Sequence, residues 1–104
     1  MSNSNLGPIG KLFSDASRWI KGALARPSRR SKEDVAARDR RATCWCLLGA
    51  IDKCYRTPGQ RKIIRDAVEA QLDRQGWSGG IANWNDASGR KIGEVQQLVE
   101  RLGI

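Results

Sequence analysis

The residues best suited to chemistry in this sequence are its arginines and lysines, which gather in two stretches. Residues 26–41 contain seven basic side chains, and a second group occupies residues 56–65. Guanidinium and ammonium groups pair with phosphate oxygens, so such clusters favour contact with a nucleic-acid backbone. In a compact chain the two stretches are predicted to form one positive surface. The residues expected to contact phosphate are Arg29, Arg30, Arg40, Arg41, Arg61, Lys62 and Arg65.

The overall charge agrees with this hypothesis but does not select the partner. The 104 residues include 19 Lys and Arg against 11 Asp and Glu, which gives a net charge of +8. Residues 1–41 hold ten basic and four acidic side chains, whereas residues 42–104 hold nine and seven. A field of this sign attracts nucleic acid, acidic protein surfaces and anionic lipid alike, and it also keeps a protein surface soluble without any partner. No helix-turn-helix, zinc-finger or basic-zipper pattern is visible, so sequence-specific DNA binding is not predicted.

A second candidate site surrounds the tripeptide Trp84-Asn85-Asp86, which follows a glycine-rich loop containing Trp77. The simpler interpretation is structural: Asp86 or Ser88 caps the helix that follows, and Asn85 hydrogen-bonds within its own turn. The alternative is a polar pocket that takes a small ligand or a partner's basic residue. We favour the structural interpretation and keep as the alternative a pocket formed by Trp77, Trp84, Asn85 and Asp86.

Catalysis is not expected, because the residue types that usually perform it are missing. The sequence has no histidine, which is the commonest general base and metal ligand. It has neither a Walker loop nor a dinucleotide fingerprint. Cys44, Cys46 and Cys54 fall short of a four-ligand zinc site, and the first two would diverge on a helix, so all three are interpreted as small buried hydrophobic residues. No catalytic residue, metal or cofactor is predicted.

The elements that must position these side chains are predicted to be helices. Apolar residues recur at helical spacing over residues 9–25, 42–55, 60–75 and 88–102, and no alternating β pattern competes. The 42–55 segment is apolar on all sides, which is typical of a buried helix, and the small residues Gly49 and Ala50 are expected to let neighbouring helices approach closely. Residues 26–41 are expected to be a basic connection with a short helix over 32–41. The predicted fold class is all-α: a compact bundle of four to five helices around the buried helix at about 42–55.

The whole chain, residues 1–104, is predicted to be one domain with residues 1–6 disordered. No run approaches the roughly 18 uninterrupted apolar residues of a membrane span, and the N-terminal segment is interrupted by charges that a signal peptide lacks. An odd number of cysteines argues against a secreted disulfide framework. A cytoplasmic location is therefore expected, and the sequence favours no particular oligomeric state.

Three short motifs, taken in order, resemble an uncharacterised family of small helical domains from bacteria and their phages. They read Trp-x-x-Gly-Ala-x-Ala at residues 19–25, Trp-Cys-x-Leu-Gly-Ala at 45–50 and Trp-Asn-Asp at 84–86. The resemblance covers most of residues 12–102 and implies a compact helical domain whose motifs lie close together in space. It implies no activity. Where relatives carry a short Asp-x-x-Gly turn, this chain has the basic stretch that begins at Pro27, which suggests a specialised partner.

These observations predict a non-enzymatic binding protein of a bacterium, plasmid or phage that contacts nucleic acid or a nucleoprotein complex through a basic surface. The alternative is a protein–protein interaction module with an acidic partner, such as a phage-encoded inhibitor of a host defence (anti-CRISPR-type) or regulatory complex. Trp77 is the candidate hot spot for that alternative, so an exposed Trp77 would favour it and a buried one would weaken it. A third hypothesis places residues 9–25 on anionic lipid as an amphipathic helix.

Overall fold

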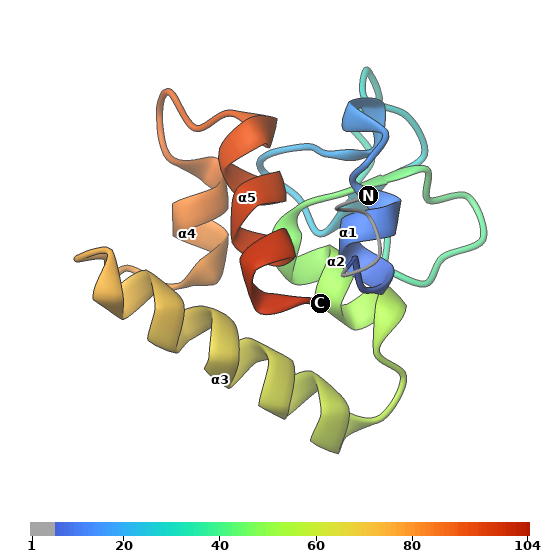
Figure 1. The fold of residues 1–104 in the computed structure, drawn as a ribbon. Coiled ribbons are helices and arrows are strands. Elements are labelled where there is room, and N and C mark those ends of the chain that lie inside the picture. Colours follow the sequence, from blue (N-terminus) through green and yellow to red (C-terminus); the bar gives the residue numbers. More distant parts are fainter. Residues whose placement is uncertain (1–5) are drawn as a thin grey trace.

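The computed structural model describes residues 6–104, and over that range the chain is mostly helical (Figure 1). The helices are α1 Pro8–Leu12, α2 Leu47–Cys54, α3 Pro58–Arg74, α4 Ile81–Asp86 and α5 Ile92–Leu102, with a 3₁₀ turn η2 Ala16–Arg18. Two short strands, β1 Ala25–Arg26 and β2 Cys44–Trp45, pair in antiparallel fashion. The prediction of a mainly helical fold is confirmed, but all-α is too simple a description because this small sheet lies between η2 and α2.

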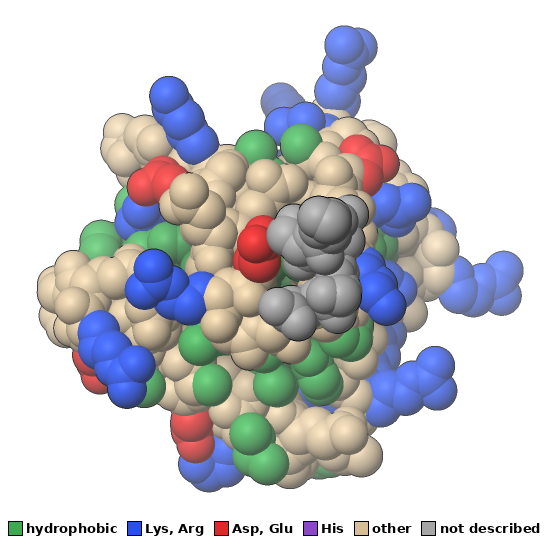
Figure 2. All heavy atoms as spheres, in the orientation of Figure 1, with side chains coloured by type: hydrophobic (Ala, Val, Ile, Leu, Met, Phe, Trp, Pro, Cys, Tyr) green, Lys and Arg blue, Asp and Glu red, His purple; other side chains and the backbone are tan. Residues whose placement is uncertain are grey.

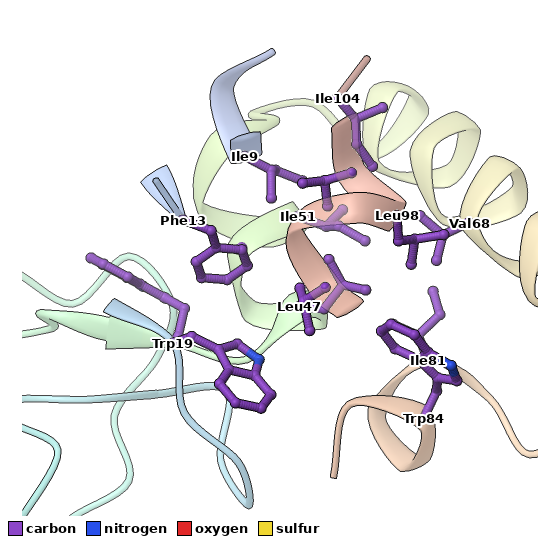
Figure 3. Close-up of a cluster of buried hydrophobic side chains, with 14 of the residues drawn as sticks. Ile9, Phe13, Trp19, Leu47, Ile51, Val68, Ile81, Trp84, Leu98 and Ile104 are labelled. Carbon is purple, nitrogen blue, oxygen red and sulfur yellow. The ribbon is translucent and has the colours of Figure 1, made fainter. Parts of the chain in front are cut away.

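The hydrophobic core draws on all five helices. α2 packs against α1, α3 and α4, while α5 packs against α1 and α3. Figure 3 shows the centre of this core, with Leu47 between Trp19 and Trp84. α2 thus lies at the middle of the molecule, as predicted, with α3 along one edge in Figure 1. The largest side chains with almost no exposed surface include Ile9, Phe13, Leu47, Ile51, Val68, Leu72, Val95 and Val99.

The helix predicted over residues 9–25 is wrong beyond Leu12. Asp15 accepts a hydrogen bond from the Ser17 backbone N–H and starts the 3₁₀ turn. The chain then becomes extended, because Trp19 forms a bridge with Trp45, whose carbonyl accepts the N–H of Ile20 at 3.0 Å. The apolar spacing in this segment reflects burial in an irregular chain, and the lipid-binding helix hypothesised there is absent.

The short helix predicted over residues 32–41 is also wrong, because tertiary contacts take the backbone groups that such a helix would need. Val35 N–H donates to the Ala25 carbonyl at 3.0 Å, which attaches the middle of the segment to β1. The Ala37 carbonyl accepts the indole N–H of Trp45 at 2.8 Å. Residues 26–41 are therefore held to the rest of the fold by backbone groups of Arg26, Val35 and Ala37 rather than by a helix of their own.

The buried helix predicted at 42–55 begins only at Leu47, since Cys44 and Trp45 pair with β1. Gly49 has a close neighbour, but it is the non-helical backbone of Leu24 rather than a helix: a Cβ at position 49 would overlap the Leu24 carbonyl oxygen. The helix predicted at 60–75 is confirmed with a slightly earlier start. Thr57 caps it, because its Oγ1 accepts the Gln60 N–H at 3.1 Å.

The C-terminal region differs from prediction at the Trp-Asn-Asp tripeptide. Residues 84–86 lie in α4, and α5 begins at Ile92, four residues later than expected. Asp86 and Ser88 therefore do not cap α5; instead, the Glu94 carboxylate accepts the Lys91 backbone N–H at 2.9 Å. The predicted end of this helix at residue 102 is confirmed, and Gly103 follows it with φ of 69°.

Residues 1–5 of the predicted disordered start lie outside the described residues, and Leu6 is half-buried. In the described part of the chain, no helix combines the length and the apolar character that crossing a bilayer requires.

Candidate functional site

Asn85 is fully buried at the end of α4, and its amide uses all of its hydrogen-bonding positions. Its Oδ1 accepts the indole N–H of Trp19 at 2.6 Å and the backbone N–H of Leu47 at 3.0 Å. Its Nδ2 donates to the Ile20 carbonyl at 3.0 Å and to Asp86 Oδ1 at 2.9 Å. A primary amide has two donors and two acceptor positions, so nothing is left for a ligand. Asn85 acts as a cross-link between distant segments, rather than within its own turn.

This cross-link brings the three motifs together. Asp86 Oδ1 also accepts the Gly22 N–H at 3.0 Å, and Lys21 Nζ donates to the Ala87 carbonyl at 2.9 Å. Residues 19–22 of the first motif, Leu47 of the second and residues 85–86 of the third thus share one hydrogen-bond network. Their proximity in the structure agrees with what the resemblance implied.

The four residues of the predicted pocket do not line one cavity. Trp84 lines a groove between α3 and α5, and Trp77 lines a separate hollow of about 160 Å³. Asn85 and Asp86 line neither. Arg90 connects the two rings, because its guanidinium carbon lies 4.0 Å from the centre of the Trp84 ring and 5.9 Å from that of Trp77. The residue of this region that could contact a ligand is therefore Arg90, which lines two of the hollows described next.

The first of these surfaces, here called the α3–α5 groove, has a volume of about 480 Å³. Three arginines line it and Glu94 is its one carboxylate. Arg90 Nη1 pairs with that carboxylate at 3.0 Å, and the Lys91 N–H and Arg90 together lower the pKa of Glu94. The groove consequently offers two further arginines, Arg74 and Arg101, with no carboxylate partner among the described residues. Its lining consists of Gln71, Arg74, Gln75, Trp84, Arg90, Glu94, Gln97, Leu98 and Arg101.

The second surface, here called the Lys21 hollow, has a volume of about 380 Å³ and no acidic residue in its lining. Of its cations, Arg26 pairs with Asp34 at 3.1 Å, whereas Lys21 and Arg29 have no carboxylate partner among the described residues. The full lining is Trp19, Ile20, Lys21, Arg26, Arg29 and Arg90.

The third surface, the Arg18 hollow, has a volume of about 360 Å³ and lies beside the second. Its carboxylate, Asp15, faces Arg18 at 3.7 Å. Hydrogen bonds from Ser17 are the main reason that the pKa of Asp15 is lowered. Arg29 also lines this hollow, so the sole acid here is already engaged by neighbouring groups.

Two shared residues join these surfaces. Arg90 lines both the α3–α5 groove and the Lys21 hollow, and Arg29 lines both the Lys21 and the Arg18 hollows. We call the resulting series the basic track. Its two carboxylates, Glu94 and Asp15, are each paired with an arginine of the track. Its cations are Arg18, Lys21, Arg26, Arg29, Arg74, Arg90 and Arg101.

Of the residues predicted from sequence to contact phosphate, Arg29 lies in the basic track, while Arg30 and Arg40 are exposed without a carboxylate partner in the described chain. Arg41 pairs with Glu33 at 2.9 Å and with Asp39 at 3.2 Å, and this contact lowers the pKa of Asp39. Much of the charge of Arg41 is therefore balanced within the basic connection.

The predicted residues on α3, Arg61, Lys62 and Arg65, line none of the three hollows of the basic track. Lys62 pairs with Asp66 at 2.8 Å, and Arg65 is half-buried. The two basic stretches do meet at one point, because Arg38 and Arg61 both donate to the Tyr55 carbonyl, at 3.0 and 3.1 Å. Figure 2 shows lysine and arginine side chains around the rim of the face drawn, rather than in one patch on it.

Six cations of the basic track were not predicted to contact phosphate: Arg18, Lys21, Arg26, Arg74, Arg90 and Arg101. Arg26 lies in the first basic stretch, whereas the other five lie outside both stretches, so neither basic stretch marks them. Of these five, Arg90 had a signal, because it lies four residues beyond the Trp-Asn-Asp tripeptide.

Comparison with known proteins gives a family but no further relative. No curated protein and no solved structure matches the chain. Residues 11–103 match the model of DUF6197, a family of unknown function, and the chain therefore belongs to that family.

Proposed function

We propose that the protein binds single-stranded nucleic acid along the basic track without catalysing a reaction on it. The observation that supports this most directly is the sharing of Arg90 and Arg29 between neighbouring hollows. A strand that follows these hollows would meet cation after cation, and the only carboxylates on its way are already paired. Binding of this kind gains free energy by releasing counterions from the strand and depends strongly on salt.

The concave shape of the track favours a single strand over a duplex. A single strand is flexible enough to follow a series of hollows, and proteins that bind it combine a basic groove with contacts to the bases. Trp19 and Trp84 line the track but are 8% and 3% exposed, so neither ring presents an open stacking face. Binding is consequently expected to rest mainly on phosphate contacts and to show little sequence preference outside the α3–α5 groove.

The basic connection supports the proposal because its backbone is anchored on both sides of Arg29 before any ligand arrives. The Thr43 side chain donates to the Pro27 carbonyl at 2.8 Å, and the Thr43 N–H donates to the Arg26 carbonyl at 2.9 Å. With the bond between Val35 and Ala25, these contacts anchor the segment at both sides of Arg29. An anchored segment loses less conformational entropy on binding than a free one.

The test is a fluorescence anisotropy titration of a labelled oligonucleotide at several salt concentrations. The double variant Lys21→Ala/Arg29→Ala removes two cations from the Lys21 hollow, and Lys62→Ala/Arg65→Ala removes two from α3 as the charge-matched control. For a single strand each lost phosphate contact lowers the slope of log K against log salt by about 0.7. The track variant should lose about 1.4 from that slope and the control should keep the wild-type value. Salt-independent binding, or equal losses in both variants, would contradict the track.

The proposal extends to the biological setting expected from sequence: a bacterial cell, a plasmid or a phage, with the protein in the cytoplasm of the bacterium or infected host. The three cysteines are free in the structure, which suits a reducing compartment. The protein–protein alternative has less support. Trp77 is half-buried and donates its N–H to the Gly80 carbonyl at 2.9 Å. The exposed large hydrophobic side chains in the described chain are Leu24 and Ile63, which belong to separate segments.

A further inference from the structure

Two polar side chains in the α3–α5 groove are nearly buried and have no hydrogen-bond partner among the described residues. Gln71 is 7% exposed and Trp84 is 3% exposed, and both line the groove. Trp19, Trp45 and Trp77 each donate the indole N–H to an oxygen of the protein, whereas Trp84 does not. Among the described residues, every completely buried side-chain nitrogen or oxygen has a hydrogen-bond partner. The Gln71 amide and the Trp84 N–H therefore keep a small contact with solvent, and both residues line the groove.

Such nearly buried groups are candidates to bind a ligand. An amide or indole N–H that has lost most of its water and has no partner in the protein is stabilised by a ligand group that hydrogen-bonds to it. In native proteins each such group is usually explained by a bound water, ion or ligand, or by a functional role. Here the two lie in the same concavity, together with the unpaired cations Arg74 and Arg101.

We propose that the α3–α5 groove holds one nucleotide of the bound strand, with the base against Gln71 and Trp84 and a phosphate toward Arg74 and Arg101. This deepens the proposed nucleic-acid binding and rests on it. A glutamine amide presents a donor beside an acceptor, which matches the amino group and adjacent ring nitrogen of adenine. The volume of about 480 Å³ lies in the range of small-molecule sites and far exceeds what a bare phosphate fills.

Arg90 has a positioning role in this site. Its Nε donates to the Trp84 carbonyl at 2.8 Å, its Nη1 pairs with Glu94, and its guanidinium covers one face of the Trp84 ring. These contacts fix Trp84 in the groove and neutralise the only acid there. With this face covered and the residue only 3% exposed, the ring has no open face on which a base could stack, so recognition must use the indole N–H and the Gln71 amide.

The indole N–H groups of the four tryptophans allow a direct NMR test of nucleotide binding in the groove. In a spectrum of ¹⁵N-labelled protein each indole N–H gives its own signal, and the variant Trp84→Phe identifies the signal of Trp84 by its loss. Adenosine monophosphate should shift the Trp84 signal and the Gln71 side-chain amide, while the signal of Trp45, bonded to the Ala37 carbonyl, stays in place. The other three nucleoside monophosphates and inorganic phosphate are titrated in the same way.

Two variants check the assignment of roles. Gln71→Met keeps the volume of the side chain without its polar atoms and should weaken adenosine monophosphate about 5- to 150-fold, while inorganic phosphate binds as before. Arg56→Ala removes an exposed cation outside the groove and should change neither ligand. A Trp84 signal that no nucleotide moves, equal affinity for phosphate and adenosine monophosphate, or an unchanged Gln71→Met would overturn the proposal.

The oligonucleotide titration distinguishes nucleotide binding in the α3–α5 groove from strand binding along the basic track. If the oligonucleotide binds with the expected salt dependence but the Trp84 signal does not respond to nucleotides, the track stands and the base site fails. If nucleotides shift Trp84 and the oligonucleotide does not bind, the groove is a mononucleotide site and the track fails.

Discussion

Replacing Asn85 by alanine should remove a large part of the stability of the protein. The substitution leaves three groups without partners: the Trp19 indole N–H, the Leu47 backbone N–H and the Ile20 carbonyl. Each such group, when buried, costs about 1–3 kcal/mol, so the three together cost about 3–9 kcal/mol. Water that enters the vacated space will recover part of this cost. We expect Asn85→Ala to lower the free energy of unfolding by about 3–6 kcal/mol, against about 5–15 kcal/mol for a whole domain.

The assay is urea denaturation followed by far-UV circular dichroism, with Asn83→Ala as the control. Asn83 lies on the same helix and is exposed, and its side chain makes a single bond, to the Gly79 carbonyl. Its replacement should cost less than about 1 kcal/mol. If Asn85→Ala costs no more than the control, the network does not hold the three segments together and the reasoning is refuted.

Asn85→Asp provides a second measurement if the alanine variant does not fold. Aspartate keeps the acceptor for Trp19 and Leu47 but loses the bond to Ile20 and places a carboxylate beside Asp86. Burial and the neighbouring negative charge raise the pKa of such a group, so it binds a proton more readily in the folded protein. The loss of stability in Asn85→Asp should therefore shrink as the pH is lowered from 7 to 5. A loss that is constant with pH would show that neither burial nor the charge of Asp86 raises the pKa of the introduced carboxyl group.

The remaining predictions concern backbone space and titration. Gly49→Ala should cost about 3 kcal/mol or more in urea denaturation, because a Cβ there would overlap the Leu24 carbonyl, whereas Gly59→Ala, which meets nothing within 4 Å, should be neutral or stabilising. Equal effects of the two would contradict the close approach. The pKa of Glu94 is lowered from 4.5 by its bonds to Lys91 and Arg90, so the stability that this group contributes is present above pH 4.5 and lost as the pH falls through its folded value. Burial raises the pKa of Cys46 above 9.0, so the stability it contributes is present below pH 9 and lost as the pH rises through its folded value. With no histidine in the chain, thermal unfolding should give a nearly constant midpoint from about pH 5 to 8, and a step within that range would contradict this account.

The elements that sequence reasoning predicted correctly are those with local signals. In α3, Val68 and Leu72 lie at helical spacing on the buried side, and this spacing predicted the helix. The prediction missed its start at Pro58, which Thr57 caps. α5 ends at Gly103 for an equally local reason. In such segments the residues that determine the structure are only a few positions apart.

The errors fall where distant residues determine the local structure. Trp19 and Ile20 have helical spacing relative to Ile9 and Phe13, but their conformation is fixed by bonds to Trp45 and Asn85. Nothing near Trp19 in the sequence indicates those partners.

The same applies to the candidate site. Residues 26–41 are conspicuous as a basic run, yet the structure balances Arg41 with nearby carboxylates and leaves Arg29 beside Lys21 and Arg90. Composition identified a positive protein, but the grouping of its cations depends on how loops from three regions pack together. The sequence gives no indication that Gln71 lacks a hydrogen-bond partner, because its position on α3 is that of any residue on the buried side of the helix.

The bonds of Asn85 also govern when this chain can complete its fold. They join α4 to residues 65 and 66 positions earlier and to Leu47, 38 positions earlier. Closing loops of that length costs chain entropy before the bonds repay it, so α3, whose contacts are local, is expected to form before this network. A chain growing from the ribosome cannot pair Trp19 or Leu47 until α4 has emerged, and until then those groups remain exposed to incorrect partners. Substitutions at Asn85 should therefore act mainly on the rate of unfolding and leave the rate of folding almost unchanged.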